Sequence, residues 1–297
     1  MAMVNNYHQD LVIVTMKSSN AELVAQLEEA TAGLLFPTEN YYCFKTFVWE
    51  VAEELTLEKL LQSAGIVKRV EIDDFLQFIS SAEAIATESK NKYVNLFKIL
   101  QKSLESIEIL RISISDETED LGEYETFYLI IGKTQAGDWI GISPKIDAES
   151  SARRSDILLL DSSVLVRENT LALVTELENI LAGLEFPVVQ YYVKDKIENF
   201  IIETAENREL LIGKILHSLE FVKTCAFKKF SDYYSPIRDE DEEVDFEKVK
   251  RLDRILQSNL TNIREYVIGG MAIYYLYDIG QTQGGDWIGV STIAIWT

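Results

Sequence analysis

The chain has 297 residues, of which 47% are hydrophobic, and a formal net charge of −21 from 28 basic and 49 acidic side chains. This hydrophobic content is enough for folded domains and excludes a disordered or collagen-like chain. The negative charge repels nucleic-acid phosphates and anionic membranes, so it excludes direct nucleic-acid binding and favours basic partners or cations.

The N-terminal sequence and the cysteines are typical of a cytoplasmic protein. The first residues, MAMVNNYHQD, lack the basic and apolar parts of a signal peptide. No apolar run approaches the ~20 residues that a membrane-spanning helix needs. Cys43 and Cys225 have neither CxxC nor metal-ligand spacing, so we expect reduced thiols in a cytoplasmic protein that has no membrane partner.

The first elements expected along the chain are a helix and a strand. Apolar residues recur at helical spacing at Leu23, Val24, Leu27 and Ala30. Gly33 follows them, in the position where glycine commonly ends a helix. The segment CFKTFVWEV at 43–51 alternates and is rich in aromatic and β-branched residues, which predicts a strand.

A second helix and three further strands follow. The helix is predicted over 92–106, with Tyr93, Phe97, Leu100 and Leu104 on one face. Strands are predicted at 108–115 and 127–132, and a hairpin leads into a third at 139–143. Helices and antiparallel strands in mixed order predict a layered α+β domain.

The whole pattern occurs twice. IGKTQAGDWIGIS at 131–143 and IGQTQGGDWIGVS at 279–291 agree at 10 of 13 positions. The stretch LVAQLEEATAGLLFPTENYY, which begins at Leu23, matches LVTELENILAGLEFPVVQYY, which begins at Leu173. A period of this length indicates duplication of a whole domain. We therefore predict two tandem domains, 1–149 and 156–297, joined at the polar stretch 148–156.

The repeated GDW sequences predict tight turns. Gly137-Asp138 and Gly285-Asp286 are dipeptides that tolerate the backbone of a hairpin turn. The tryptophan after each dipeptide restarts the strand, either as a half-buried sheet residue or as a partner contact.

No catalytic residues can be assigned. The two histidines, His8 and His217, lie in unrelated contexts that the repeats do not share, so no catalytic triad is recognisable. Carboxylates are so numerous that acid–base pairs arise by accident. We therefore expect a protein that is not an enzyme.

One acidic run offers an alternative function. The sequence DEDEEVDFE alternates oxygen ligands at Asp239, Asp241, Glu243, Asp245 and Glu247, but it lacks the central glycine of an EF-hand loop. It is either a solvated loop leading into a helix at Glu247 or a calcium site in an acidic regulatory protein.

Four sequences resemble the nuclease A inhibitor family of filamentous cyanobacteria. They are AGLLFPTE at 32–39, FVWE at 47–50, FKILQKSL at 97–104 and the glycine hairpin that ends in GIS at 141–143. The second half keeps AGLEFP and the hairpin, so the resemblance covers both copies. It implies two tandem α-β-α sandwich domains, each with a mainly antiparallel sheet flanked by helices. It also implies inhibition of a sugar-nonspecific endonuclease that has a ββα-metal active site.

The resemblance also implies partner-binding residues. A glutamate after the first helix, which reaches a basic residue of the nuclease, corresponds to Glu39. A C-terminal threonine, which reaches the catalytic magnesium of the nuclease, corresponds to Thr297, and Trp296 precedes it. The second copy has Val189 in place of the glutamate, and the first copy has Glu149, in mid-chain, in place of the threonine.

The two determinants are therefore split between the copies. On this interpretation the chain has no cofactor of its own, and its partner is a metal-dependent nuclease or another basic protein. A protein-interaction module with an unrelated partner remains an alternative.

Overall fold

The computed structural model describes residues 18–36, 42–50, 55–115, 123–146, 167–190, 193–232, 240–270 and 273–295. Its α-helices are α1 (Ser18–Thr31), α2 (Leu57–Ser63), α3 (Ile72–Ser81), α4 (Thr87–Ser103), α5 (Glu168–Leu181), α6 (Arg208–Ser218) and α7 (Glu240–Asn259). A short 3-10 helix, η2 (Phe230–Asp232), precedes α7.

The strands form two large sheets and one small one. The first sheet has the order β10 (Phe200–Ala205), β7 (Trp139–Pro144), β6 (Glu123–Thr134), β5 (Leu104–Ser115), β4 (Val67–Val70), with β8 (Phe186–Gln190) paired to β6 and β9 (Val193–Ile197) paired to β8. The second sheet has the order β11 (Val222–Ala226), β12 (Thr261–Gly270), β13 (Ile273–Gln281), β14 (Trp287–Ile295), β3 (Lys45–Trp49). The small sheet pairs β1 (Leu35–Phe36) with β2 (Tyr42–Cys43).

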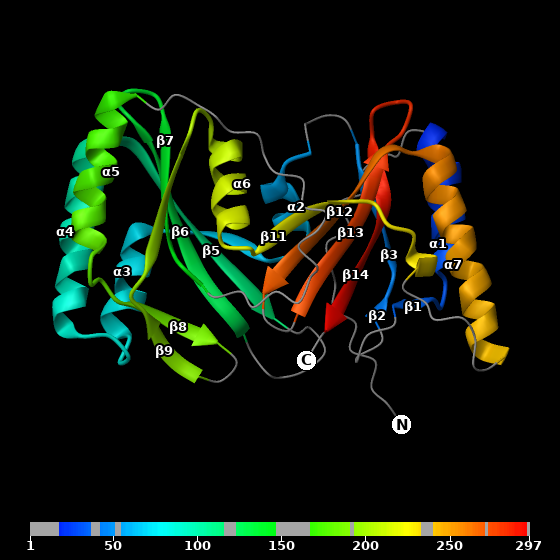
Figure 1. The fold of residues 1–297 in the computed structure, drawn as a ribbon, viewed down its shortest axis with the longest axis horizontal. Coiled ribbons are helices and arrows are strands. Elements are labelled where there is room, and N and C mark those ends of the chain that lie inside the picture. Colours follow the sequence, from blue (N-terminus) through cyan, green and yellow to red (C-terminus); the bar gives the residue numbers. More distant parts are fainter. Residues whose placement is uncertain are drawn as a thin grey trace.

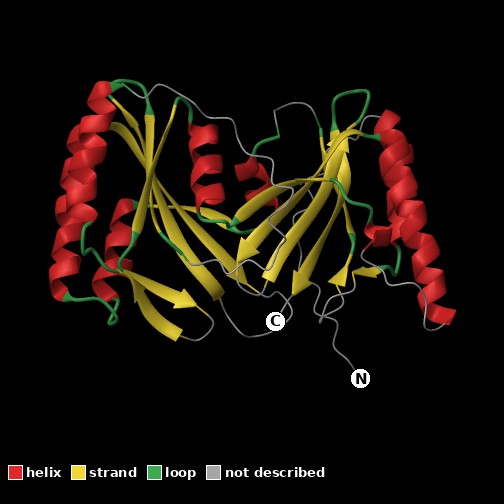
Figure 2. Cartoon of the chain, in the orientation of Figure 1, coloured by secondary structure: helices red, strands yellow, loops and turns green. Residues whose placement is uncertain are grey.

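Helical layers alternate with the two sheets. Helices α4 and α5 cover the outer face of the first sheet, and α1 and α7 cover the outer face of the second (Figure 1). Helices α2 and α6 lie between the sheets (Figure 2). Every pairing among the described strands is antiparallel. The predicted α+β class, with antiparallel sheets flanked by helices, is confirmed.

Several predicted boundaries differ from those in the structure, and two of these differences have a physical explanation. The helix predicted over 92–106 ends at Ser103, and Leu104 begins β5 because its backbone pairs with Thr134. The acidic run was expected to precede a helix at Glu247, but α7 already begins at Glu240. Negative side chains are stabilised at the positive N-terminal end of a helix, which explains why this acidic stretch becomes helical.

The two copies exchange their N-terminal segments. Strand β3 of the first copy pairs with β14 of the second, and β10 of the second pairs with β7 of the first. Helix α1 packs against α7, and α5 packs against α4. In Figure 1 the blue β3 accordingly lies beside the red β14. We call residues 18–49 the first exchanged segment and residues 167–205 the second.

The exchange is symmetric: strands that correspond in the two copies occupy the same position in the order of their sheets. The order β4-β5-β6-β7-β10 repeats as β11-β12-β13-β14-β3. Trp139 pairs with Ala205 at the β10 edge of the first sheet, and Trp287 pairs with Trp49 at the β3 edge of the second sheet. The sequence division into 1–149 and 156–297 therefore separates the copies of the repeat, but each sheet takes strands from both copies. The predicted join at 148–156 lies outside the described residues.

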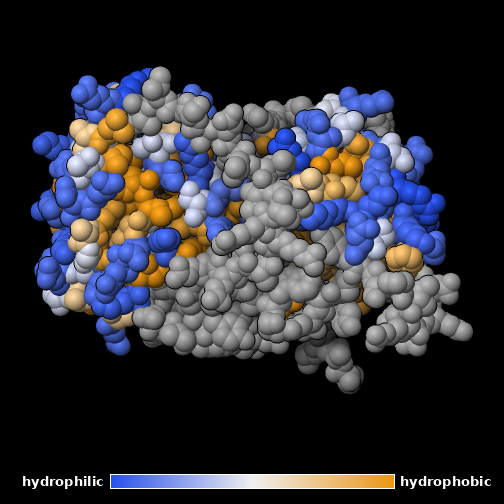
Figure 3. Space-filling model, viewed as in Figure 1, coloured by the Kyte–Doolittle hydropathy of each residue, from blue (hydrophilic) through white to orange (hydrophobic). Residues whose placement is uncertain are grey.

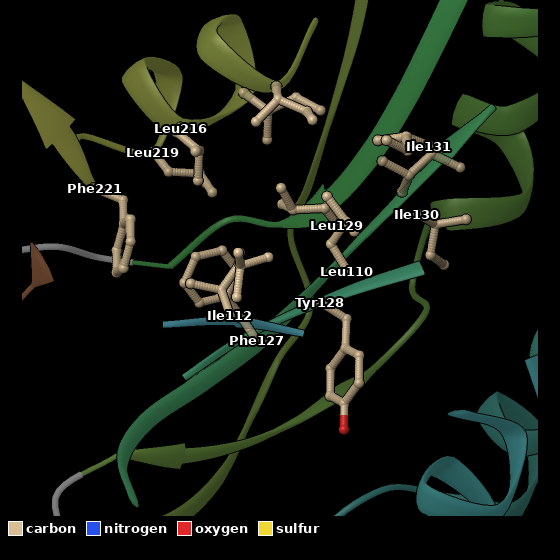
Figure 4. Packing of buried hydrophobic residues seen from close by; sticks show 14 of the residues in the cluster. Leu110, Ile112, Phe127, Tyr128, Leu129, Ile130, Ile131, Leu216, Leu219 and Phe221 are labelled. Carbon is tan, nitrogen blue, oxygen red and sulfur yellow. The ribbon is translucent and has the colours of Figure 1, made fainter. Parts of the chain in front are cut away.

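One apolar core links the two sheets. It extends from α4 and α5 through the first sheet and the central helices to the inner face of the second sheet. Alternation along β6 turns Phe127 towards Phe221, at a ring distance of 5.0 Å, and points Tyr128 to the opposite face (Figure 4). There Tyr128 packs against Phe186. A second cluster fills the space between the second sheet and its outer helices α1 and α7.

Candidate functional site

Glu39, Trp296 and Thr297 lie outside the described residues, but their neighbours are described. Phe36 ends β1 and Tyr42 begins β2, so these strands flank Glu39. Strand β14 ends at Ile295. The structure brings these flanking strands together, because β1 and β2 both lie against β14.

Side-chain and backbone contacts hold this end of the second sheet together. The Thr292 hydroxyl donates to the Cys43 carbonyl at 3.3 Å, which joins β14 to β2. The Phe44 amide donates to the Leu34 carbonyl at 3.4 Å. Phe36 is 2% exposed and packs edge-to-face against Phe44 at 5.8 Å. We refer to this region, β1 and β2 together with the last residues of β14, as the composite end.

The direction of the strands explains why they meet here. Strand β3 pairs with β14 from Trp49 opposite Trp287 to Lys45 opposite Ser291. Because the pairing is antiparallel, the C-terminal end of β14 lies beside the N-terminal end of β3. Strand β2, which begins at Tyr42, directly precedes that end of β3. In Figure 1 the arrowhead of β14 accordingly ends beside β2.

The two repeated hairpins have the same turn. The Gly137 amide donates to Thr134 and the Thr134 amide donates to the Asp138 carbonyl, at 2.9 and 2.8 Å. The bonds that correspond to these in the second copy, between Thr282, Gly285 and Asp286, are both 2.9 Å. Gly137 and Gly285 have φ angles of 95° and 86°, a conformation in which a side chain is strained. The turn prediction is confirmed.

The tryptophans that follow these turns are half-buried, as expected for sheet residues. Trp139 and Trp287 are the first residues of β7 and β14 and pair across the sheet with β10 and β3. Lys59 on α2 lies 5.0 Å above the ring of Trp49, the neighbour of Trp287. Burial and strand pairing explain the positions of Trp139 and Trp287 as sheet residues, and no contact with a partner protein is needed to explain them.

The aspartates of the turns bind the exchanged segments, which sequence reasoning missed. The Asp138 carboxylate accepts from the Thr170 hydroxyl at 2.7 Å, and the Asp286 carboxylate accepts from the Asn20 amide at 2.9 Å. Asn20 and Thr170 occupy the same position in the two copies, 150 residues apart. The sequence did carry a signal for this contact: in both copies a polar residue, Asn20 or Thr170, lies at helical spacing before the apolar residues that face the core.

A second buried polar cluster lies between the sheets. Arg208 on α6 donates to Glu58 on α2, at 2.9 Å for one of its bonds, and to Glu108 on β5, at 2.9, 3.1 and 3.2 Å. Hydrogen bonds to Glu58, then to Glu108, raise the pKa of Arg208 against the opposing effect of burial. This cluster fixes the central helices to the first sheet.

The predicted calcium ligands belong mainly to a helix. Asp241, Glu243, Asp245 and Glu247 are in α7, and Asp239 lies outside the described residues. Within the described ranges, no three His, Cys, Asp or Glu side chains are grouped so that they could hold a metal ion.

Cys43 and Cys225 form no disulfide in the part of the chain that the structure describes. His217 is largely buried, and burial lowers its pKa. In the parts of the chain that the structure describes, no helix has the length and apolar character needed to cross a membrane.

The surface shows where apolar groups remain exposed. In Figure 3 hydrophilic side chains cover most of the right-hand edge, where α1 and α7 lie, whereas apolar side chains gather in the half of the molecule that contains the first sheet. Leu171 on α5 and Val94 on α4 are 53% and 46% exposed.

Comparison with known proteins identifies the repeat. A family model described as nuclease A inhibitor-like protein matches residues 21–147 and 173–297. The two matched regions are the two copies of the repeat, and together they cover well over half of the chain. No curated protein matches the sequence.

Proposed function

The chain belongs to the nuclease A inhibitor-like family, and we propose that it binds and inhibits a sugar-nonspecific endonuclease with a ββα-metal active site through the composite end of the second sheet. Glu39 would contact a basic residue of the nuclease. Thr297, with Trp296 before it, would direct oxygen atoms towards the magnesium of the nuclease. The chain itself would carry no metal and perform no catalysis.

The observation that carries this proposal is the exchange of N-terminal segments. In sequence, the glutamate is in the first copy and the terminal threonine is in the second. Exchange pairs the first copy's β3 with the second copy's β14, so the strands that lead to Glu39 and to Thr297 approach the same end of one sheet. The two determinants that the sequence separates would thus act together.

The other sheet lacks the corresponding residues. The second exchanged segment has Val189 where the first has Glu39, and Val189 is paired with Thr126 in the first sheet. Strand β7 ends at Pro144 and the chain continues towards Glu149, so this copy has no terminus. We therefore expect one nuclease per chain, bound at the second sheet.

Charge supports the same partner. A nuclease groove binds phosphate through cations, and a protein of net charge −21 is attracted to such a groove. Oxygen atoms are the ligands that magnesium prefers. The hydroxyl of Thr297 can offer an oxygen atom in place of a phosphate oxygen.

Truncation tests the mechanism. Removing Trp296 and Thr297, or adding a short C-terminal tag, should abolish inhibition of a ββα-metal endonuclease assayed with magnesium. Thermal stability should change little, because terminal residues bury little surface. Full inhibition by the truncated chain would refute the role of Thr297. Failure of the intact chain to inhibit any nuclease of this class would refute the function itself.

A matched pair of substitutions tests the glutamate. Glu39→Gln should weaken binding by about 1–3 kcal/mol, the range for a hydrogen bond to a charged group. Glu149→Gln, at the mid-chain position that corresponds to Thr297 in the first copy, should leave binding unchanged. Equal losses in the two variants would contradict a specific role for Glu39.

A further inference from the structure

Each repeated hairpin ends in a buried carboxylate that faces the other copy. Asp138 and Asp286 are only 6% and 1% exposed. Turn formation alone does not require burial, because aspartate is common in exposed turns. Each side chain instead points to the beginning of an exchanged helix, Asp138 to α5 and Asp286 to α1.

The contacts of Asp138 show what such a carboxylate does. One oxygen accepts from the Thr170 hydroxyl at 2.7 Å and from the Arg167 backbone amide at 3.2 Å. The other oxygen lies 3.2 Å from the Arg167 guanidinium, which also donates to the Ala136 carbonyl in the turn. A methyl group on Gly137 would come within 2.8 Å of that guanidinium. The hairpin and the start of α5 are therefore closely fitted.

The start of α5 lies against this carboxylate. Arg167, the residue that precedes the helix, provides no side-chain cap. The first amides of a helix have no partners within the helix, and a negative charge beside them is favourable. Asp138 supplies this charge, and it accepts from the Arg167 amide just before the helix and from the Thr170 hydroxyl in the first turn, although it belongs to the other copy.

Asp286 repeats the arrangement on the other side. It accepts from Asn20, which is 3% exposed and lies near the start of α1. A bond between a carboxylate and a buried amide is stronger than one between neutral groups. Helix α1 leads directly into β1, β2 and β3, and therefore into the composite end.

We propose that Asp138 and Asp286 are positioning residues that latch the two exchanged segments onto the sheets of the opposite copies. Asp286 holds the first exchanged segment, and Asp138 holds the second. The repeated GDW sequence is thus a docking point for a helix of the other copy. Resting on the proposed function, Asp286 alone also positions the nuclease-binding end.

Segment-resolved hydrogen–deuterium exchange of the full chain tests the latch. Asp286→Ala should speed amide exchange in α1 by about tenfold, the equivalent of one strong hydrogen bond, and leave α5 unchanged. Asp138→Ala should speed exchange in α5 and leave α1 unchanged. The reverse pattern, or no local change in either variant, would overturn the proposal.

Milder variants keep the test valid if an alanine variant fails to fold. Asn20→Ala and Thr170→Ala remove only the donor and should affect α1 and α5 respectively. Asp286→Asn retains an acceptor oxygen but loses the charge, so it should restore part of the protection lost in Asp286→Ala. Equal effects of Asp286→Asn and Asp286→Ala would show that a neutral acceptor cannot hold Asn20 and that the charge of Asp286 is required.

Inhibition assays then separate the latch from the proposed function. Asp286→Ala should reduce affinity for the nuclease about tenfold, whereas Asp138→Ala should retain it. If amide exchange changes as expected but both variants inhibit equally, the latch stands and the assignment of the composite end is refuted. If no variant inhibits the nuclease, the amide hydrogen–deuterium exchange results still show whether Asp138 and Asp286 hold the exchanged segments.

Discussion

A buried carboxylate distinguishes the second sheet from the first. Asp278 on β13 is 2% exposed, and one of its oxygens has no hydrogen-bond partner among the described residues. Asp278 pairs with Val290, and the corresponding pair in the first sheet is Ile130 with Ile142. Burial, and then the nearby carboxylates of Glu265 and Asp253, raise the pKa of Asp278 well above its ordinary value.

Replacing this carboxylate should change how stability depends on pH. Because its pKa is raised in the folded state, the contribution of Asp278 to the free energy of unfolding is fully present below the unfolded pKa of about 3.9. This contribution is lost as the pH rises through the folded-state pKa. Asp278→Asn removes the titration. The variant should therefore gain stability relative to the original chain as the pH rises from 4, reaching about 1–3 kcal/mol at pH 7.

Urea denaturation between pH 4 and pH 8 measures this difference. Asp253→Asn serves as a control of opposite sign, because the Asp253 carboxylate accepts from the backbone amides of Phe230 and Ser231 at 2.8 and 3.1 Å. That variant should be destabilised. Parallel pH profiles for Asp278→Asn and the original chain would show that Asp278 stays ionised in the folded state.

At the scale of elements, the central helices differ in length. Helix α6 has 11 residues and α2 has 7. The N-terminal end of the longer helix carries Arg208, which is bound by Glu58 and Glu108 of the first copy. The buried Glu58 and the partly buried Glu108 of one copy thus receive their guanidinium from the other copy.

Removing the guanidinium should therefore be costly. Arg208→Gln removes the cation that Glu58 and Glu108 share, although Glu108 keeps its contact with Arg69, and should destabilise the chain by roughly 2–4 kcal/mol, close to the cost of breaking a buried ion pair. Arg69→Gln is the control, because Arg69 also contacts Glu108, at 3.0 Å, but its side chain is 68% exposed. It should cost less than about 1 kcal/mol. Similar thermal melts for the two variants would disprove a structural role for Arg208.

At the scale of the molecule, the two copies are joined by strand pairing as well as by the chain. An arrangement without exchange would form the same types of contact, with β3 beside β7 and β10 beside β14. Lys45 would then face Ser143, the residue that corresponds to its present partner Ser291. A cross-link can therefore distinguish the two arrangements.

We expect a disulfide between Lys45→Cys and Ser291→Cys in a chain whose native cysteines are replaced by serine. Residues directly opposite each other in antiparallel strands are within the range that a disulfide spans. After cleavage at a protease site inserted between 148 and 156, the halves should remain covalently joined on a non-reducing gel. The control pair Lys45→Cys and Ser143→Cys should not form a disulfide; its formation would contradict the exchange.

The charge of the whole molecule predicts how binding responds to salt. Attraction between a chain of net charge −21 and a basic groove is screened over about 8 Å at physiological ionic strength. Affinity for the nuclease should fall steadily as salt is increased, mainly through a slower association rate. Titrations from low to high salt measure this change, and an affinity independent of salt would rule out electrostatic attraction as a driving force.

The sequence by itself determined the local structure and the duplication. Apolar spacing from Leu23 to Ala30 predicted α1, alternation at 43–51 predicted β3, and the dipeptides at Gly137 and Gly285 predicted the hairpins, because these features depend on interactions between near neighbours. The resemblance over both copies identified the family. Helix boundaries were less certain, since Leu104 is apolar in either a helix or a strand and only pairing with Thr134 made it a strand residue.

Only the tertiary structure decided which copy completes each sheet. Strand β3 fits β7 as well as β14 in pattern, because the two hairpins are near copies of each other, and nothing local distinguishes them. The choice depends on contacts between residues far apart in the chain, such as Asn20 with Asp286 and Thr170 with Asp138. Glu39 and Thr297 belong to separate copies in the sequence, but the strands that lead to them lie together in the fold because β3 pairs with β14.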